Sequence, residues 1–386
     1  MADHFQIRTD KISQLLEKRF SVYPKRDNSY FQLCEALNEF ADYLRSGIDY
    51  SDFHKNPEVI QEAEKFSTKP IFICGSMKSG TSLLSQLLDN HPDLLVMPGD
   101  SHYVNNTDKW DRRQFEEIST FWLKRLINPT GKKPFWFIGP GRSQLETFLR
   151  YLYYFLSNSS KDAFVCAIMA VYAANSKSSG LHPKRYWIEK TPHNELNALK
   201  LNSRFPDAKF IHILRDPLEN IASLKRMSEI RNQDITSYEY ALLIRRLFSA
   251  AQKNKKMFGR EKYCILKYED LVANPERVLN AACGFLDIEF HETLLEPTEN
   301  GLPGISNSMF PESMVEGKIL DLSRRQRFKE LLEKQELKNI VTILYKDAMR
   351  AGYNWNDPEI TCYRRPQFKQ HYHNLMTRIK LRLSRF

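Results

Sequence analysis

The chain has no apolar run long enough to cross a membrane, and its first residues lack the apolar stretch of a secretory signal peptide. It also has no internal repeat and no low-complexity tract. Its six cysteines show neither the spacing of metal ligands nor a disulfide framework, at Cys34, Cys74, Cys166, Cys264, Cys283 and Cys362. We therefore expect a cytoplasmic protein without a metal site.

Acidic residues are absent from the last part of the chain. The formal net charge is +10, and residues 364–386 carry seven basic side chains and no acid, which leaves +3 (10 − 7) for the rest. Leu375, Ile379 and Leu383 recur there at helical spacing between basic residues. This pattern is typical of a helix lying on an anionic membrane surface, with a solvated tail as the alternative. No nucleic-acid-binding module surrounds the tail, so nucleic acid is not an expected partner.

The strongest signal for chemistry lies in residues 69–88. Residues 71–74 form a short apolar run, as in buried parallel strands, and residues 75–80 form a turn bounded by glycines. Thr81 then begins an amphipathic helix. A strand, a tight loop and a helix N-terminus direct backbone N–H groups and the positive end of the helix dipole to one point. This arrangement predicts an anion-binding loop.

The lysine of this loop stands at an unusual position. A loop that binds ATP reads G-x-x-x-x-G-K-[ST], and Gly75 and Gly80 fit that pattern. The next residue is Thr81, however, and the lysine lies inside the loop as Lys78. No obvious magnesium-binding acid follows an apolar strand. The pattern favours an anionic nucleotide whose transferring group needs no Mg²⁺, and a P-loop small-molecule kinase is the alternative.

A second phosphate-type pattern follows residues 209–214, a run with strand character. Arg215 stands directly after it, where ligands of open α/β sheets bind. Ser223 lies eight residues on, about two turns into the helix predicted after Pro217. Taken alone, Arg215 is better explained as the partner of a neighbouring acid, and Ser223 as a serine that faces solvent.

Together the two patterns resemble the sulfotransferase family, which uses 3′-phosphoadenosine 5′-phosphosulfate (PAPS). The family's P-[KR]-S-G-T-[TS] loop matches residues 77–82, except that Met77 replaces the proline. The family's Arg-Asp-Pro…Ser unit, which grips the 3′-phosphate, matches residues 215–223. The resemblance covers roughly residues 70–353 and is closest to the bacterial and tyrosylprotein types. It implies that the donor is bound without a metal by Lys78, Ser79, Gly80, Thr81, Ser82, Arg215, Ser223 and Ser308.

The resemblance also implies a general base after the apolar run 94–97. The bacterial and tyrosylprotein types have a glutamate at the position of Asp100, and cytosolic members use a histidine after the corresponding strand, which makes His102 the competitor. In an extended segment, residues i and i+2 share a face, so the two side chains could act as a pair. We place Asp100 ahead of His102, and a turn role for Asp100 after Gly99 is the alternative.

Three further segments rest on the same resemblance. The sequence Glu-Lys-Thr-Pro at 189–192 implies that Lys190 contacts the transferring sulfuryl group, although a lysine at a strand end is otherwise a solvated charge. Lys318 is a candidate for the 3′-phosphate or a surface lysine. The stretch 268–271, Tyr-Glu-Asp-Leu, resembles the family in a part that we assign to the scaffold.

The motifs fall in one series of alternating strands and helices, which predicts an α/β fold with a central parallel sheet flanked by helices. The sulfotransferase domain is predicted at 67–355, between a helical extension at 1–66 and the basic tail at 356–386. The extension could cover the sheet, shape the acceptor pocket or support a homodimer. We further predict a loop over the cleft at 128–141 and a long helix at about 323–350.

The expected reaction moves a sulfuryl group in line from PAPS to an acceptor hydroxyl. Negative charge grows on the bridging oxygen of the leaving nucleotide, so cations and N–H donors are needed there. Lys78, Thr81 and the loop amides meet that need. Whether the acceptor is a glycan, a lipid, a peptide or a small molecule does not follow from the sequence.

Overall fold

The computed structural model describes residues 56–106, 110–111, 142–178, 184–299, 301–304, 306, 308–310, 315–319, 326–356, 358–361 and 363. Most of the predicted N-terminal extension, the predicted loop at 128–141 and the basic tail from 364 on therefore lie outside the described residues. The chain divides into two compact units, which are described separately. The first consists of Met1–Pro70, Pro92–Ile188 and Phe205–Asp207, and the second of Ile71–His91, Glu189–Arg204 and Ala208–Phe386.

A five-stranded sheet has the strand order β2-β3-β1-β4-β5. Its strands are β1 (Pro70–Cys74), β2 (Leu94–Asp100), β3 (Tyr186–Lys190), β4 (Lys209–Leu214) and β5 (Tyr263–Lys267). β4 pairs in parallel with both β1 and β5, with Ile71 opposite Lys209 and Phe210 opposite Tyr263. Every residue of β1 is buried, and so is every residue of β4 after Lys209, because a parallel sheet is covered on both faces. The predicted central parallel sheet flanked by helices is confirmed.

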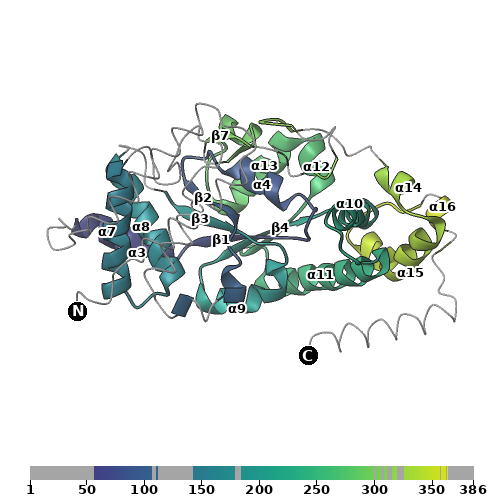
Figure 1. The fold of residues 1–386 in the computed structure, drawn as a ribbon, viewed down its shortest axis with the longest axis horizontal. Helices are drawn as coiled ribbons and strands as arrows, with labels where there is room; N and C mark the ends of the chain where they lie inside the picture. Colours follow the sequence, from purple (N-terminus) through teal and green to yellow (C-terminus); the bar gives the residue numbers. More distant parts are fainter. Residues whose placement is uncertain are drawn as a thin grey trace. The chain divides into compact units, whose positions relative to one another are not determined.

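The helices of the second unit lie on both faces of β1 and β4. They are α4 (Thr81–Leu88), α9 (Ala198–Arg204), α10 (Pro217–Ile230), α11 (Ser237–Phe258), α12 (Tyr268–Ala273), α13 (Pro275–Leu286), α14 (Arg327–Leu331), α15 (Lys334–Arg350) and α16 (Pro358–Thr361). In Figure 1, α4, α12 and α13 lie on one side of these strands and α9 and α11 on the other. The second unit also contains a short antiparallel hairpin of β6 (Thr298–Glu299) and β7 (Leu302–Pro303).

Local sequence signals explain where α10 and α11 begin. The Asp216 carboxylate accepts a hydrogen bond of 2.8 Å from the backbone N–H of Leu218, and Pro217 occupies the first turn of α10. Thr236 and Glu239 form a capping box at the start of α11. The Asp216 cap and Pro217 fix the start of α10, directly after Arg215.

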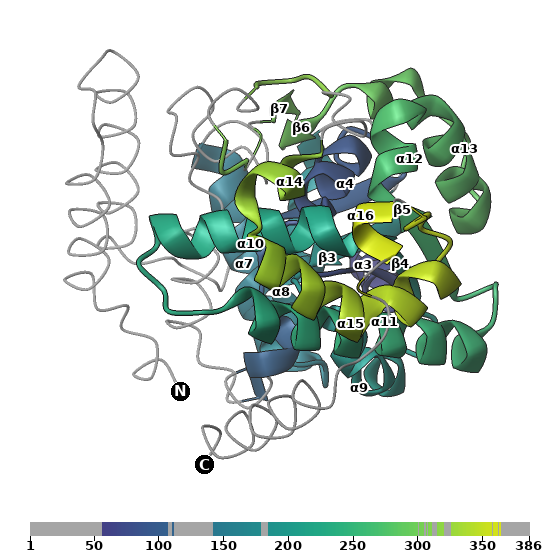
Figure 2. The same ribbon diagram turned by 90° about the vertical axis from the view of Figure 1, so that its right-hand side faces the viewer.

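The predicted long helix at 323–350 is wrong as a single element. The chain is extended at Leu332, with φ −104° and ψ 125°, so α14 ends at Leu331 and α15 begins at Lys334. Glu333 and Glu336 form a capping box that starts α15 afresh. α14 packs on α10, and α15 packs on α11, in the cluster that faces the viewer in Figure 2.

The first unit is built on α8 (Ala163–Ser178), against which α3 (Pro57–Ser67) and α7 (Arg142–Asn158) both pack. Every residue of α8 from Ala163 to Ala174 is buried. The short 3-10 helix η2 (Tyr103–Asn106) follows β2, and the Tyr103 hydroxyl donates a hydrogen bond of 2.7 Å to Asp162 just before α8. The segment that carries Asp100 and His102 is thereby tied to this helix core.

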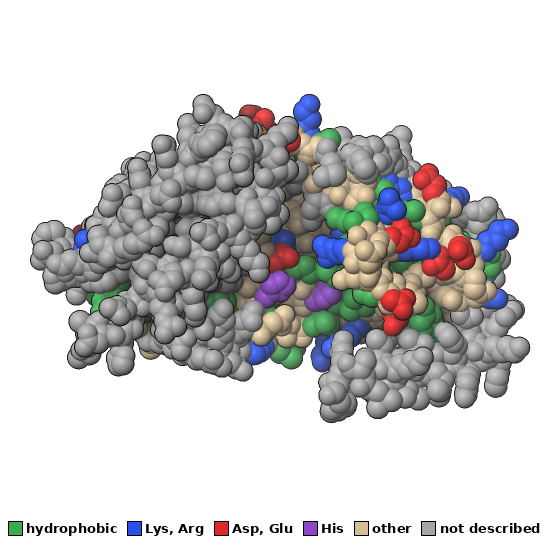
Figure 3. Space-filling view, in the orientation of Figure 1, with side chains coloured by type: hydrophobic (Ala, Val, Ile, Leu, Met, Phe, Trp, Pro, Cys, Tyr) green, Lys and Arg blue, Asp and Glu red, His purple; other side chains and the backbone are tan. Residues whose placement is uncertain are grey.

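The described surface of the second unit carries charges of both signs. In the part of Figure 3 where α10, α14 and α15 lie, lysine and arginine side chains alternate with aspartate and glutamate. Of the helices within the described ranges, none combines the length and the apolar composition of a membrane span.

Candidate functional site

The C-terminal ends of three neighbouring strands of the second unit lie at the same edge of the sheet. Because β1, β4 and β5 pair in parallel and in that order, the segments that follow them emerge side by side. The Arg215 Nη1 atom, after β4, donates a hydrogen bond of 2.8 Å to the backbone oxygen of Lys78, after β1. The Arg215 guanidinium also lies 4.8 Å from the centroid of the Tyr268 ring, after β5. The two sequence patterns that predicted anion binding therefore meet.

The loop after β1 has the backbone of a tight anion-binding turn. Gly75, Lys78 and Gly80 all have positive φ, at 145°, 63° and 103°. A Cβ on Gly75 would lie 2.7 Å from the backbone oxygen of Ile213, so only glycine fits there. Thr81 is buried and is the first residue of α4, as predicted.

Hydrogen bonds hold the loop from within and from α10. The Ser79 hydroxyl donates to the backbone oxygen of Ser76 at 2.7 Å, and the Asn220 side chain donates to the backbone oxygen of Met77 at 2.9 Å. The Ser79 hydroxyl thus turns toward its own loop. Ser79 and Thr81, unlike their neighbours Lys78, Gly80 and Ser82, are not among the residues that line the cavity described below.

The buried carboxyl group of Glu195 accepts a hydrogen bond from the first residue of the loop. The Glu195 Oε2 atom accepts a hydrogen bond of 2.9 Å from the Gly75 N–H, and the His193 N–H donates to the Gly75 oxygen at 3.0 Å. The Asn254 side chain in turn donates to the backbone oxygen of Glu195 at 2.8 Å. Burial raises the pKa of Glu195 to about 7, and the N–H of Gly75 opposes that rise. No sequence motif pointed to Glu195.

Lys190 is not the solvated charge that a strand-end lysine usually is. It is 8% exposed, and its Nζ atom donates a hydrogen bond of 3.3 Å to the Ser82 hydroxyl at the start of α4. Glu189 is buried as well, and accepts hydrogen bonds from Thr191 and Asn194. The Glu-Lys-Thr-Pro segment thus folds on Glu189 and directs Lys190 to the anion-binding loop.

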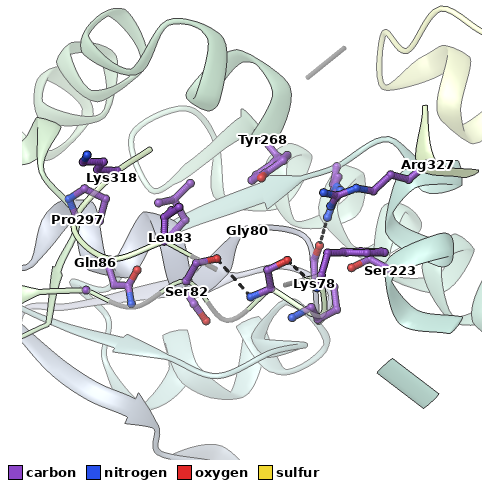
Figure 4. A pocket seen from close by; sticks show the side chains of 16 residues that line it. Lys78, Gly80, Ser82, Leu83, Gln86, Ser223, Tyr268, Pro297, Lys318 and Arg327 are labelled. Carbon is purple, nitrogen blue, oxygen red and sulfur yellow. Dashed lines mark hydrogen bonds between the residues drawn. The ribbon is translucent and has the colours of Figure 1, made fainter. Parts of the chain in front are cut away.

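A cavity of the second unit collects most of the predicted donor residues. Lys78, Gly80, Ser82, Arg215, Ser223 and Ser308 all line it. Figure 4 shows Ser223 and Arg327 at one end of this cavity, and Gln86, Pro297 and Lys318 at the other. Lys78, Arg215, Lys318 and Arg327 give the wall positive charge, and none of the described lining residues is acidic. The cavity is suited to an anion with several charged groups.

The Arg215 guanidinium contacts neighbouring residues and can still donate a further hydrogen bond. Its Nη2 atom lies 3.8 Å from the Glu219 carboxylate, so the predicted pairing with a neighbouring acid does occur. Ser223, however, is 4% exposed and lines the cavity, which contradicts the solvent-facing alternative. Among the described residues, the buried Nε atom of Arg215 has no hydrogen-bond partner. Such an orphaned donor costs about 1–3 kcal/mol, and a bound anion would satisfy it.

The crowding of cations is visible in the pKa of Lys78. Burial, followed by the charges of Arg215, Arg231 and Lys190, lowers this pKa to about 8. A bound anion would offset the repulsion between these cations. The electrostatics of the loop therefore favour an anionic ligand beside Lys78.

The two candidate bases belong to the first unit. Asp100 is half-buried at the end of β2, whereas His102 is exposed and has a left-handed backbone with φ 53°. The prediction that residues 100 and 102 share a face assumed an extended segment, and that premise is wrong because the strand ends at Asp100. Ser101 between them is buried and accepts a hydrogen bond of 3.0 Å from the Tyr103 N–H. The base role of either residue stays a prediction.

Several residues of the cavity wall were not predicted from the sequence, and three of them make ring contacts there. Tyr268, which we had assigned to the scaffold, covers Arg215 and lines the cavity. Phe310 and Arg327 line it as well, with the guanidinium carbon of Arg327 4.0 Å from the centroid of the Phe310 ring. Tyr268 could have been found from its place directly after a strand that ends beside β4. Arg327 carries no such local signal.

Comparison with known proteins gives matches that agree with one another. A family model described as "Sulfotransferase family" matches residues 70–292. Protein-tyrosine sulfotransferase 2 of Gallus gallus is 25% identical over 241 residues, which cover 61% of this chain and 55% of that protein. Protein-tyrosine sulfotransferase 1 of Danio rerio is 25% identical over 230 residues, covering 59% and 56%. The chain thus spans a little over half the length of these curated relatives.

Among solved structures, the sulfotransferase domain from the curacin biosynthetic pathway aligns with a TM-score of 0.47 at 17% identity. The alignment covers 74% of this chain and 97% of that one.

Proposed function

The chain belongs to the sulfotransferase family, and we propose that it moves a sulfuryl group from PAPS to an acceptor hydroxyl. The observation that carries the proposal is the contact between Arg215 and Lys78 in the wall of a cation-lined cavity. PAPS carries anionic groups at both ends of its ribose, and this cavity offers cations along its length. The kinase alternative is not favoured, because the loop lacks the ATP-type lysine and the family match points elsewhere.

One end of the donor would be held by the loop after β1. Lys78, Ser82 and the loop amides would bind the 5′-phosphosulfate, and the Lys190 ammonium, already bonded to Ser82, would contact the sulfuryl group. These donors would stabilise the negative charge that grows on the bridging oxygen as the sulfur–oxygen bond breaks. Each charge-assisted hydrogen bond there is worth on the order of 1.5–3 kcal/mol.

The other end of the donor would be held by Arg215 and Ser223. The Nε of Arg215, which has no hydrogen-bond partner among the described residues, and the buried hydroxyl of Ser223 are the donors that a 3′-phosphate would satisfy. Ser308, in the same wall, would assist the donor from the turn after β7.

The acceptor proton would be removed by Asp100, with His102 as the alternative base. For the acceptor itself, the names of the relatives give a starting point, because two of them are protein-tyrosine sulfotransferases. We therefore place a tyrosine hydroxyl in a peptide first, and a glycan, a lipid or a small alcohol after it. The cytoplasmic location, the homodimer, the membrane contact of the basic tail and the absence of a metal stay predictions from the sequence.

A transfer assay tests the proposal. The full chain is incubated with PAPS labelled in its sulfuryl group, in the presence of a chelator, with tyrosine-containing peptides and a panel of other hydroxyl compounds. We expect label in at least one acceptor class, and none with Lys78→Met. No transfer from PAPS, together with phosphorylation of an acceptor in a parallel assay with Mg²⁺ and ATP labelled in its γ-phosphate, would instead support the kinase.

A further inference from the structure

The hairpin of β6 and β7 is fixed to the C-terminal end of α4. The Asp89 Oδ2 atom, directly after this helix, accepts hydrogen bonds of 2.9 Å from the Thr298 hydroxyl and 2.8 Å from the Gly301 N–H. The Thr293 hydroxyl, just before the hairpin, donates to the backbone oxygen of Asn90 at 3.1 Å. β6 packs on α4, and the hairpin lies beside this helix in both Figure 1 and Figure 2. The hairpin and α4 therefore hold each other in place.

An acid is an unfavourable residue at the position of Asp89. The C-terminal end of a helix carries the negative end of the helix dipole, so a cation is favoured there and a carboxylate is repelled. The Thr298 hydroxyl and the Gly301 N–H offset this repulsion, since both donate to the same carboxylate oxygen. The hairpin thus explains Asp89, whereas the helix does not.

The other end of α4 belongs to the anion-binding loop. Ser82, in the first turn of this helix, accepts the hydrogen bond of 3.3 Å from the Lys190 Nζ atom. α4 has eight residues, so roughly 12 Å separates its two ends at the usual rise per residue. One short helix therefore connects the contact of Lys190 with the contact of the hairpin.

Strand alternation places Glu299 on the face of the hairpin that is opposite Asp89. The chain is extended at Glu296, with φ −111° and ψ 111°, and continues into β6. Successive residues of an extended segment point to opposite faces. Thr298 is on the face that binds Asp89, and Pro297 and Glu299 are on the other face. Pro297 lines the cation-rich cavity, as Figure 4 shows, so Glu299 shares the face directed to the site.

The carboxyl group of Glu299 is an electrostatic neighbour of Lys190. Its side chain is half-buried and, within the described part of the chain, makes neither a hydrogen bond nor an ion pair. Burial raises the pKa of this carboxyl, and the charge of Lys190 lowers it. The hairpin therefore presents a negative group to the lysine that bonds to Ser82.

Lys190 needs such a partner because other cations repel it. Its charge is one of those that lower the pKa of Lys78, after burial and the charges of Arg215 and Arg231. An ammonium on a flexible four-carbon stem moves away from like charges unless an opposite charge attracts it. A carboxylate on an anchored hairpin supplies that attraction from a fixed point.

We propose that the β6–β7 hairpin is a positioning element for sulfuryl transfer, in which Asp89 anchors the hairpin and Glu299 holds the Lys190 ammonium in place. This inference rests on the proposed function, where Lys190 contacts the sulfuryl group. Glu299 acts through Lys190, and Asp89 acts through the hairpin that carries Glu299. Loss of the Glu299 charge should therefore slow the transfer step and leave the binding of the nucleotide nearly unchanged.

Rate and affinity are measured separately on the full chain. Single-turnover transfer from PAPS labelled in its sulfuryl group, to the most active acceptor of the panel above, gives the rate. Calorimetric titration with adenosine 3′,5′-bisphosphate (PAP), the donor without its sulfuryl group, gives the affinity. Thermal unfolding checks that each variant is folded.

The variants separate the two roles. Glu299→Gln removes the charge, and it is made both in the wild type and together with Lys190→Met. Asp89→Ala removes the anchor, whereas Asp89→Asn keeps an acceptor oxygen. Glu296→Gln, an exposed position of the same segment, is the matched control.

We expect Glu299→Gln to slow the transfer about 10- to 100-fold and to leave PAP affinity within about twofold of the wild type. In the Lys190→Met background the same change should add little, because Glu299 acts through Lys190. Asp89→Ala should slow the transfer as well, Asp89→Asn should restore most of the rate, and Glu296→Gln should match the wild type.

Four results would contradict this inference or its basis. A Glu299→Gln protein that transfers at the wild-type rate, or that loses PAP affinity as much as rate, would overturn the role of Glu299. Equal slowing by Glu299→Gln with and without Lys190 would show that it does not act through this lysine. An Asp89→Ala protein as fast as the wild type would remove the anchor. In these cases the proposed function stands, whereas a wild-type chain that labels no acceptor would contradict the proposed function and this inference together.

Discussion

Gly80 packs so closely under the ring of Tyr268 that a Cβ on Gly80 would overlap the ring carbon Cδ2. The same ring lies over the guanidinium of Arg215, 4.8 Å from its carbon to the ring centroid. A glycine of the loop after β1 is therefore linked through one aromatic ring to the arginine after β4. This contact makes the backbone of the loop and the position of Arg215 depend on each other.

Gly80→Ala should damage the site through this contact. The new methyl group would displace Tyr268, and φ 103° strains any residue with a Cβ, so we expect a loss of roughly 1–3 kcal/mol in the free energy of unfolding. Donor binding should weaken as well. Gly284→Ala is the control, because Gly284 lies in α13 with open space around it and should gain up to about 1 kcal/mol. Chemical denaturation and PAP titration measure both effects, and a Gly80→Ala protein that behaves like Gly284→Ala would contradict the packing described.

Lys78 should take up a proton when the donor binds. Its pKa of about 8 is depressed by burial and by neighbouring cations, and a bound anion favours the ammonium form. At about pH 8.5 most of the ligand-free protein therefore has a neutral Lys78 that becomes charged on binding, and the affinity should fall as the pH rises above about 8. Calorimetry of PAP binding in two buffers with different ionisation enthalpies measures the uptake. It should be present in the wild type and lost in Lys78→Met, and equal uptake in both would rule out Lys78 as its source.

Glu195 should make stability depend on pH. Its pKa is raised from 4.5 to about 7, so between these values the folded chain still holds a proton that the unfolded chain has lost. The free energy of unfolding from this group therefore decreases as the pH rises from about 4.5 to about 7. Glu195→Gln keeps an acceptor for the Gly75 N–H. It should abolish this pH-dependent decrease in the free energy of unfolding, which is on the order of 1–3 kcal/mol. Denaturation at about pH 5 and pH 8 measures it.

Glu292→Gln, an exposed position, is the control for Glu195. If Glu195→Gln and Glu292→Gln change stability between the two pH values as the wild type does, the buried carboxyl of Glu195 is not the titrating group.

The base is assigned by paired variants. Asp100→Asn should slow the chemical step by roughly 10²- to 10⁴-fold and leave PAP affinity nearly unchanged, since general-base catalysis contributes that much. His102→Ala should stay active. Single-turnover transfer from PAPS measures the step, and PAP titration is the control for folding. An active Asp100→Asn together with an inactive His102→Ala would make the histidine the base.

Local sequence patterns predicted those parts of the site that are formed by residues close together in the chain. The glycine-bounded turn at 75–80 and the position of Arg215 after a strand follow from turn chemistry and from strand-end geometry. Both are found where the sequence predicts them, and the parallel pairing of β1 with β4 explains why they meet. Ser223 was assigned from the family resemblance, since the local pattern alone favoured a serine that faces solvent, and it is buried in the cavity wall.

Contacts between distant segments could not be predicted in the same way. Arg327 enters the site through packing of α14 on α10, where Phe328 and Glu219 are 109 residues apart in the chain. Glu195 accepts the hydrogen bond of Gly75 across a separation of 120 residues. The break at Leu332 was missed because the apolar spacing continues past it, while a capping box restarts the helix at Glu333. The predicted pairing of Asp100 with His102 assumed an extended chain that ends at Asp100.

Nucleotide choice tests the central claim most directly. The wild-type chain is titrated calorimetrically with PAP and with ATP–Mg²⁺, each in the presence and in the absence of a chelator. We predict that PAP binds more tightly than ATP–Mg²⁺ and that the chelator leaves PAP affinity unchanged, because Lys78, Arg215 and Ser223 supply the contacts. Tighter binding of ATP–Mg²⁺, or PAP binding that the chelator abolishes, would contradict a metal-independent PAPS site.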